Sequence, residues 1–205
     1  DSHPELSATM YRVNLIRFMF KRYDPIAEKN NLELALSDTN ERLQERYKIK
    51  FDQESVAKKV RDINSYNYGN IYDIIMSELY INESCTHWAE KNQLMWREIP
   101  AFIGMLPNAK AVHIIRDPRS VLASFKNYTR YGYPACLGSV FNSYDALINA
   151  FQHQQYLSES VKLIKYEDLI NNTDDRIRDI WRFIGLDSNH DIIKDNLIDS
   201  YGNNW

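Results

Sequence analysis

Hydrophobic positions recur at helical spacing near the start of the chain. Residues 11–23 place apolar side chains three and four apart on overlapping faces, which predicts a largely buried helix. Asp24-Pro25 is expected to end it, because the residue before a proline is disfavoured in the helical region. Residues 30–50 are polar and charged with little apolar stripe, so we expect a peripheral segment.

Two further helices are predicted before residue 83. Asp52 has the character of an N-cap, and the valines Val56 and Val60 fall on one side of the helix that follows it. A second helix is predicted over residues 71–80. The first eighty-odd residues are therefore expected to be mainly helical.

The pattern changes after residue 83. Residues 110–116 form a short, β-branched and almost continuously apolar run, which predicts a strand buried on both faces. Asp117-Pro118 follows directly, and an Asp N-cap with proline at the first helical position is a strong helix start. Val121, Leu122 and Phe125 supply the expected buried face of that helix.

The same order occurs a second time. Residues 161–166 predict another strand, and residues 174–184 predict a helix that Gly185 ends. One long helix, residues 138–158, lies between the two strands. This order of elements predicts an α/β fold with parallel strands joined by crossovers, and ligands are expected at the carboxyl ends of the strands. The absence of a linker predicts a single domain over residues 1–205.

Composition limits the classes of function. The 205 residues include 25 Lys and Arg against 28 Asp and Glu, a net charge of −3 that supplies no global positive field for nucleic acid or anionic membrane. The apolar runs are too short for a membrane span. Cys85 and Cys136 are far apart, so we expect free thiols and a cytoplasmic location. The residue patterns of metal sites are missing, so no metal is expected.

The junction at residues 116–125 carries the clearest chemistry. A buried strand would deliver Arg116 to its carboxyl end, where the helix that follows presents its backbone N–H groups, so a cation and a helix dipole converge. Ser120 and Ser124 lie one turn apart and offer hydroxyl groups on one helix face. The residues alone leave two interpretations: an anion site, or an Arg116 paired with Asp117 or another carboxylate beside serines that face solvent.

This junction resembles the 3′-phosphate motif of the sulfotransferases that use 3′-phosphoadenosine 5′-phosphosulfate (PAPS), in which an Arg is followed eight residues later by a Ser. Further segments resemble that family in the same order. The segments are HIIRDPRSVLASF (113–125), DSHP (1–4), WAEK (88–91) with IP (99–100) and LPNAK (106–110), and LIKYEDL (163–169). A weaker likeness links Gly202 and Trp205 to a GxxW segment of the family.

The resemblance implies a fold and roles for residues. The fold is an α/β, P-loop-NTPase-like parallel sheet flanked by helices, with a helix-rich N-terminal part. Arg116 and Ser124 would bind the 3′-phosphate with Ser120 nearby, Tyr166 would lie near the adenine, and Lys91 near the sulfuryl group. An exposed Lys91 and a core Tyr166 are the plain structural alternatives. The family's Gly/Ser/Thr-rich phosphosulfate loop is absent, because the first glycine is Gly69. We therefore expect the first strand and loop to be missing and both ends to be clipped.

The catalytic base is the second departure from the family. The positions where the family often has an acidic base carry Ala8, Thr9 and neighbouring residues here. His87, four residues before Lys91, is our candidate, with Glu5 and Glu90 as alternatives. His113 is expected to be structural, and His153 and His190 suggest no function. An aromatic loop around Gly132 and Tyr133 would overhang the cleft and shape acceptor choice, or simply pack.

The combined expectation is a sulfotransferase that moves a sulfuryl group from PAPS to an acceptor hydroxyl or amine by in-line displacement, without a metal. The acceptor would be a small molecule, a glycan or a peptide. The rival is a non-catalytic nucleotide-binding or interaction module that retains the 3′-phosphate half-site. A nucleotide kinase is disfavoured, because no Walker loop is present.

Overall fold

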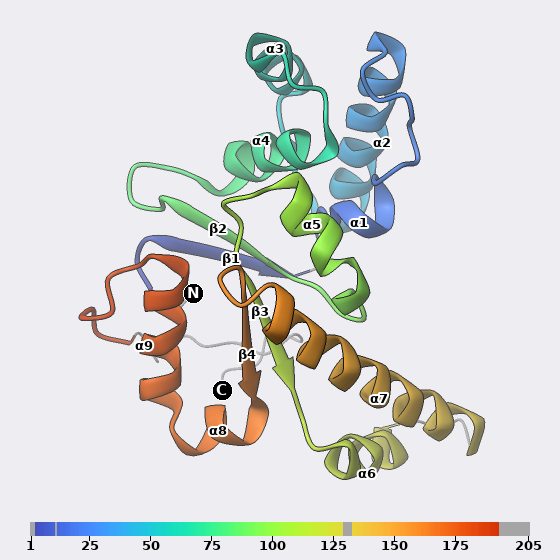
Figure 1. Ribbon diagram of the computed structural model, residues 1–205. Coiled ribbons are helices and arrows are strands. Elements are labelled where there is room, and N and C mark those ends of the chain that lie inside the picture. The colour runs from blue at the N-terminus through green and yellow to red at the C-terminus, as the bar shows by residue number, and fades with distance from the viewer. Residues whose placement is uncertain (1–2, 11, 129–132, 193–205) are drawn as a thin grey trace. The chain divides into compact units, whose positions relative to one another are not determined.

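The computed structural model describes residues 3–10, 12–128 and 133–192, and the chain divides into two compact units (Figure 1). The first unit comprises residues 1–92, 104–106 and 191–205, and the second comprises residues 93–103 and 107–190. The assignment of a single domain stays a prediction. Within the described residues, no helix combines the length and the apolar character needed to cross a membrane.

The described residues 3–92 of the first unit form a small parallel sheet and several helices. Its elements are β1 (Leu6–Met10), α1 (Leu15–Phe18), α2 (Lys29–Tyr47), α3 (Gln53–Ile63), α4 (Tyr68–Tyr80) and β2 (His87–Lys91). β1 and β2 are parallel, with Thr9 opposite Glu90 and Met10 opposite Lys91. The strand β1 was not predicted from the sequence.

The prediction of Asp52 as an N-cap was correct, and the predictions for residues 11–23 and 30–50 were wrong. Asp52 accepts hydrogen bonds from the amides of Glu54 and Ser55, as predicted. The helix predicted over residues 11–23 is wrong, since α1 contains only four residues. The peripheral interpretation of residues 30–50 is also wrong: α2 buries five side chains at helical spacing, Leu32, Ala35, Leu36, Thr39 and Leu43.

The chain then passes through the short 3-10 helix η1 (Trp96–Glu98) and α5 (Ile99–Met105). The remaining elements are β3 (Ala111–Ile115), α6 (Pro118–Tyr128), α7 (Tyr133–Tyr156), β4 (Val161–Lys165), α8 (Tyr166–Asn171) and α9 (Thr173–Ile184). β3 and β4 are parallel, which confirms the predicted crossover. Gly185 ends α9 with a φ of 88°, a conformation that glycine adopts readily.

The core of the second unit includes two histidines. His113 on β3 and His153 on α7 are 7% and 4% exposed, with ring centroids 5.9 Å apart. The structural role predicted for His113 is consistent with this burial, whereas the burial of His153 was not predicted. β3 is not buried on both faces as predicted, because Ile114 is 49% exposed. Phe125 was also expected to face the core and is 38% exposed.

A candidate anion site at the ends of β3 and β4

The register of two parallel strands brings Arg116 and Tyr166 together. Ile115 lies opposite Lys165, the last residues of β3 and β4, so Arg116 and Tyr166 leave the sheet side by side. The Arg116 guanidinium carbon lies 4.6 Å from the centroid of the Tyr166 ring. This is a cation–π contact, which supports a guanidinium without neutralising its charge. Arg116 is exposed and Tyr166 is half-buried.

The neighbouring carboxylates are held by other groups. Asp117 forms an ion pair with Arg119, with Nη2 2.5 Å from Oδ2, and this contact lowers the pKa of Asp117 to about 2. Glu167 accepts a hydrogen bond of 3.0 Å from the Asp117 amide, which lowers the pKa of Glu167. Among residues 3–10, 12–128 and 133–192, Arg116 has no ion pair within 4.0 Å. The pairing of Arg116 with Asp117 that the sequence left open is therefore not observed.

The backbone amides at the start of α6 contribute less than expected. The Arg119 amide donates to Asp117 Oδ1 at 2.8 Å, and the Asp117 amide donates to Glu167. These amides were predicted to be free for an anion, and that prediction is wrong because the Asp117 carboxylate binds the first and the Glu167 carboxylate binds the second. The groups of this junction that stay candidates for binding an anion are the Arg116 guanidinium and the hydroxyls of Ser120 and Ser124.

Ser120 and Ser124 both lie on α6, as predicted. Ser120 is half-buried and Ser124 is exposed. Sequence reasoning did not anticipate the roles of Glu167 and Arg119. The only signal was position: Glu167 directly follows Tyr166 at a strand end, and Arg119 is two residues from the N-cap.

Lys91 and His87 belong to the first unit and stand at opposite ends of β2. Residues four apart on a strand lie on the same face, with Cα atoms about 13 Å apart at roughly 3.3 Å per residue. The strand therefore does not bring the two side chains together. Lys91 is exposed and His87 is half-buried.

Thr86 links the Glu5 carboxylate to the His87 ring. Thr86 Oγ1 donates to Glu5 Oε2 at 3.2 Å and lies 2.9 Å from His87 Nδ1. Since a hydroxyl has one hydrogen, Thr86 can donate to Glu5 only where His87 Nδ1 supplies the hydrogen of the second bond. A neutral His87 in this arrangement keeps a lone pair on Nε2, the form that a general base requires. Glu5 thus acts on His87 through Thr86.

Glu90, the other candidate base, is fully occupied. Its carboxylate accepts from the amides of Val13 and Asn14, each at 2.8 Å, and from the Tyr72 hydroxyl at 2.6 Å. Tyr72 is buried, and burial followed by the Glu90 charge raises its pKa well above the ordinary value. These contacts hold the turn between β1 and α1 and indicate an anchor rather than a proton acceptor.

Arg42 holds the same turn from its carbonyl side. Its guanidinium donates to the carbonyl oxygens of Arg12 and Val13 at 2.6 and 2.7 Å. Burial lowers the pKa of Arg42. Side chains of this chain therefore bind the backbone amides of the turn on one side and its carbonyl oxygens on the other.

Comparison with known proteins identifies the family. A family model described as "Sulfotransferase family" matches residues 1–191. The chain belongs to the sulfotransferase family. Among curated proteins, none matched the sequence.

Two sulfotransferase domains of known structure are similar to the chain. The sulfotransferase domain of the olefin synthase from Synechococcus PCC 7002 is similar with a TM-score of 0.50 and 18% identity, covering 91% of this chain and 75% of that one. The sulfotransferase domain from the curacin biosynthetic pathway covers the same shares with a TM-score of 0.43 and 14% identity. The first likeness supports the α/β sulfotransferase fold of this family member.

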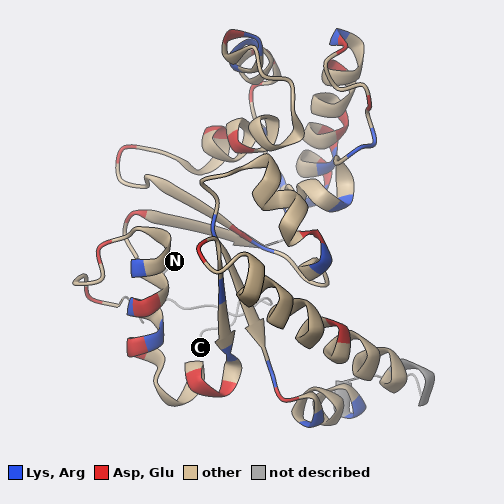
Figure 2. Ribbon diagram, in the orientation of Figure 1, with Lys and Arg blue, Asp and Glu red and all other residues tan. Residues whose placement is uncertain are grey.

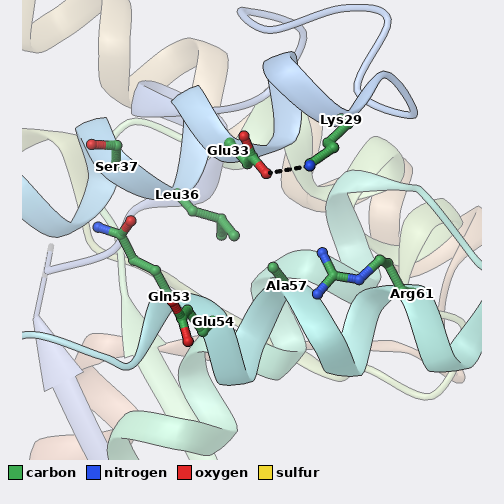
Figure 3. A pocket seen from close by; sticks show the side chains of 8 residues that line it. All are labelled: Lys29, Glu33, Leu36, Ser37, Gln53, Glu54, Ala57 and Arg61. Carbon is green, nitrogen blue, oxygen red and sulfur yellow. Dashed lines mark ion pairs between the residues drawn. The ribbon is translucent and has the colours of Figure 1, made fainter.

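The described part of this sulfotransferase also contains a pocket between α2 and α3 in the first unit (Figure 3). It has a volume of about 730 Å³, and none of the site residues predicted from the sequence lines it. Lys29 and Glu33 form an ion pair across 3.7 Å at its edge. Its lining mixes acidic and basic side chains, so it offers no region of a single charge that would bind an anion. Gly202, Trp205 and Gly132 lie outside the described residues, as do Asp1 and Ser2 of the DSHP segment, and the Tyr133 side chain is not described.

Proposed function

We propose that this sulfotransferase transfers a sulfuryl group from PAPS to an acceptor hydroxyl or amine. The observation that carries the proposal is the exposed Arg116, backed by Tyr166 at 4.6 Å and without a carboxylate partner among the described residues. An exposed guanidinium with donors in a fixed fork suits a phosphate monoester. The group that distinguishes PAPS from ATP is a 3′-phosphate of this kind.

The residues of the second unit would bind the nucleotide. Arg116 would hold the 3′-phosphate, with hydroxyl donors from Ser124 and Ser120 on α6. Tyr166 would fix the guanidinium plane and lie near the adenine. The donor supplies an activated sulfuryl group, and the chain supplies position and charge for its transfer without a metal.

The residues of β2 would act on the reacting atoms. Lys91 would place positive charge near the sulfuryl group. His87 Nε2 would take the proton of the acceptor hydroxyl as its oxygen attacks, and the Thr86 and Glu5 chain would keep the opposite ring nitrogen protonated. Because the two side chains start about 13 Å apart, the acceptor would have to lie between them.

Calorimetric titration with 3′,5′-ADP and 5′-AMP tests the nucleotide site. We expect 3′,5′-ADP to bind more tightly, and Arg116→Ala to weaken it roughly 10- to 100-fold, the worth of hydrogen bonds between charged groups. Binding of 5′-AMP should change little, because it lacks the 3′-phosphate.

The matched control is Arg182→Ala. It removes the same charge from an exposed position in the same unit, where Arg182 lies 3.9 Å from Asp179. Its affinity for 3′,5′-ADP should equal that of the wild type. Equal affinities for the two nucleotides, or equal losses in the two variants, would reject the assignment.

A non-catalytic nucleotide-binding module is the second candidate, favoured by the contacts of Glu90, an acidic candidate for the base. Its carboxylate already accepts hydrogen bonds from the Val13 and Asn14 amides and from the Tyr72 hydroxyl. Sulfate transfer from labelled PAPS to a panel of hydroxyl and amine acceptors separates the two. Binding of 3′,5′-ADP without transfer to any acceptor would favour the module, and transfer that His87→Ala abolishes would favour the enzyme.

A further inference from the structure

One face of α7 presents a continuous apolar stripe. The exposed fractions are 40% for Leu137, 68% for Phe141, 66% for Tyr144, 39% for Ile148 and 63% for Phe151. Their spacings of four, three, four and three residues place them within about 80° of arc on a helix of 3.6 residues per turn. This spacing is the one that packs two helices along a shared seam.

The opposite face of α7 already packs within its own unit. Ser139, Ala150 and His153 are buried, and α7 contacts α6, η1, β3 and β4. The stripe therefore points away from the core that α7 helps to form. Among the described elements of the second unit, none covers it.

The helix has almost no charge. Asp145 is its one charged residue, and Figure 2 shows α7 otherwise without acidic or basic positions. Arg97 holds Asp145 through two hydrogen bonds of 2.8 Å, and Trp96 donates a third. Two such helices can approach each other without like charges meeting in the seam.

The stripe is complementary to itself. If two copies pack antiparallel with Tyr144 at the centre, Leu137 meets Phe151 and Phe141 meets Ile148. Each of these pairs combines an aromatic side chain with an aliphatic one. The summed side-chain volume is therefore similar at each contact along the seam. A twofold interface requires this kind of self-complementary surface.

The area is sufficient for a dimer. The three aromatic side chains, two-thirds exposed, offer roughly 400 Å², and the two aliphatic ones add roughly 150 Å². Flanking atoms covered on contact would bring the total from two copies above about 1,200 Å², the lower bound for stable interfaces.

We propose that the chain forms a twofold homodimer through the α7 stripe, with Tyr144 at the symmetry axis. The stripe comprises Leu137, Phe141, Tyr144, Ile148 and Phe151. The occupant is a second copy because the pattern pairs with itself and no charge selects a different partner. This inference is independent of the nucleotide site and concerns assembly alone.

Sedimentation velocity over a roughly hundredfold concentration range tests the dimer on the full chain. We expect a dimer for the wild type, and at least a tenfold weaker association for Phe141→Glu, which buries two unpaired carboxylates. Asn142→Glu is the matched control, because residue 142 is exposed on the same helix about 140° from the stripe centre. It should leave association unchanged, and far-ultraviolet circular dichroism should show both variants folded.

Cysteine cross-linking tests the geometry at the axis. In a Cys85→Ser, Cys136→Ser background, Tyr144→Cys should form a disulfide-linked dimer on mild oxidation, since paired helices bring axis residues within bridging distance. The Asn142→Cys variant should run as a monomer on a non-reducing denaturing gel.

A monomeric wild type at every concentration would overturn the proposal. A dimer that Phe141→Glu and Asn142→Glu weaken equally would overturn it as well. Cross-linking at residue 142 in place of residue 144 would reject the α7 seam as the interface.

Discussion

Two junctions of this molecule have the same plan and different chemistry. At β1–α1 and at β3–α6, a parallel strand ends, the chain turns, and a helix begins. In the first junction, Glu90 and Arg42 bind the amides and the carbonyls of the turn. In the second, carboxylates cap the amides while the Arg116 guanidinium rests on an aromatic ring.

The difference shows that a strand–turn–helix unit is not by itself an anion site. Its amides attract any negative group, including a carboxylate of the same chain. The β1–α1 junction is closed, because Glu90 and Arg42 bind the amides and the carbonyls of its turn. The β3–α6 junction is open, because the Arg116 guanidinium at the strand end has no carboxylate partner among the described residues.

The largest expected effect comes from removing the carboxylate at the closed junction. Glu90→Ala leaves the amides of Val13 and Asn14 and the Tyr72 hydroxyl without an acceptor in a buried region. Because each buried unsatisfied group costs about 1 to 3 kcal/mol, we expect the free energy of unfolding to fall by about 3 to 4 kcal/mol. Urea unfolding measures this change.

Two variants make the test specific. Glu90→Gln keeps one acceptor oxygen and should lose about half as much stability. Glu83→Ala removes an exposed carboxylate from the segment before β2 and should leave stability unchanged. If Glu90→Ala unfolds like Glu83→Ala, the junction is not held by this carboxylate.

The open junction was more predictable from sequence than the closed one. Continuous apolar runs and the Asp117-Pro118 start identified β3, β4 and α6. Strands that are parallel neighbours end at the same edge, so Arg116 and Tyr166 could be expected near each other. Their assignment to a nucleotide stays a prediction.

The closed junction depends on contacts between distant parts of the chain. β1 becomes a strand by pairing with β2, some eighty residues later, and the polar alternation within Leu6–Met10 is weak. The predicted helix over residues 11–23 shortens to α1 because Glu90 and Arg42 hold the turn in a non-helical form, with Asn14 at a φ of 44°. Local propensity does not contain these tertiary contacts.

Acid should destabilise the second unit more than the first. Burial, then the nearby His153, lowers the pKa of His113 on β3 to about 4 from its ordinary 6.5. The unfolded state therefore binds the proton more readily, and stability that is complete above pH 6.5 is lost as the pH falls toward 4. We expect a loss of about 1 to 2 kcal/mol, less than the full shift implies, because relaxation and water penetration around a charged ring offset part of the cost of its burial.

Hydrogen exchange, corrected for the intrinsic rate at each pH, measures this unit by unit. Amides of β3 and β4 should lose protection over this interval before those of β1 and β2. The other groups at this site are Trp96, stacked on His113, and Asp145, which Trp96 binds. His113→Leu should flatten the pH dependence of protection in β3 and β4. His190→Asn, at an exposed position, should leave that dependence unchanged. Equal loss of protection in both sheets would contradict the prediction.

The smallest effect concerns the ring beneath Arg116. Tyr166→Leu keeps an apolar side chain of similar reach and removes the aromatic face, so the guanidinium loses its support. We expect 3′,5′-ADP to bind roughly 3- to 10-fold more weakly, less than the loss from Arg116→Ala. Tyr166→Phe retains the face and should bind as the wild type does. If Phe and Leu weaken binding equally, the Tyr166 hydroxyl acts on the nucleotide directly; if neither weakens it, the ring does not position the guanidinium and the open junction needs another explanation.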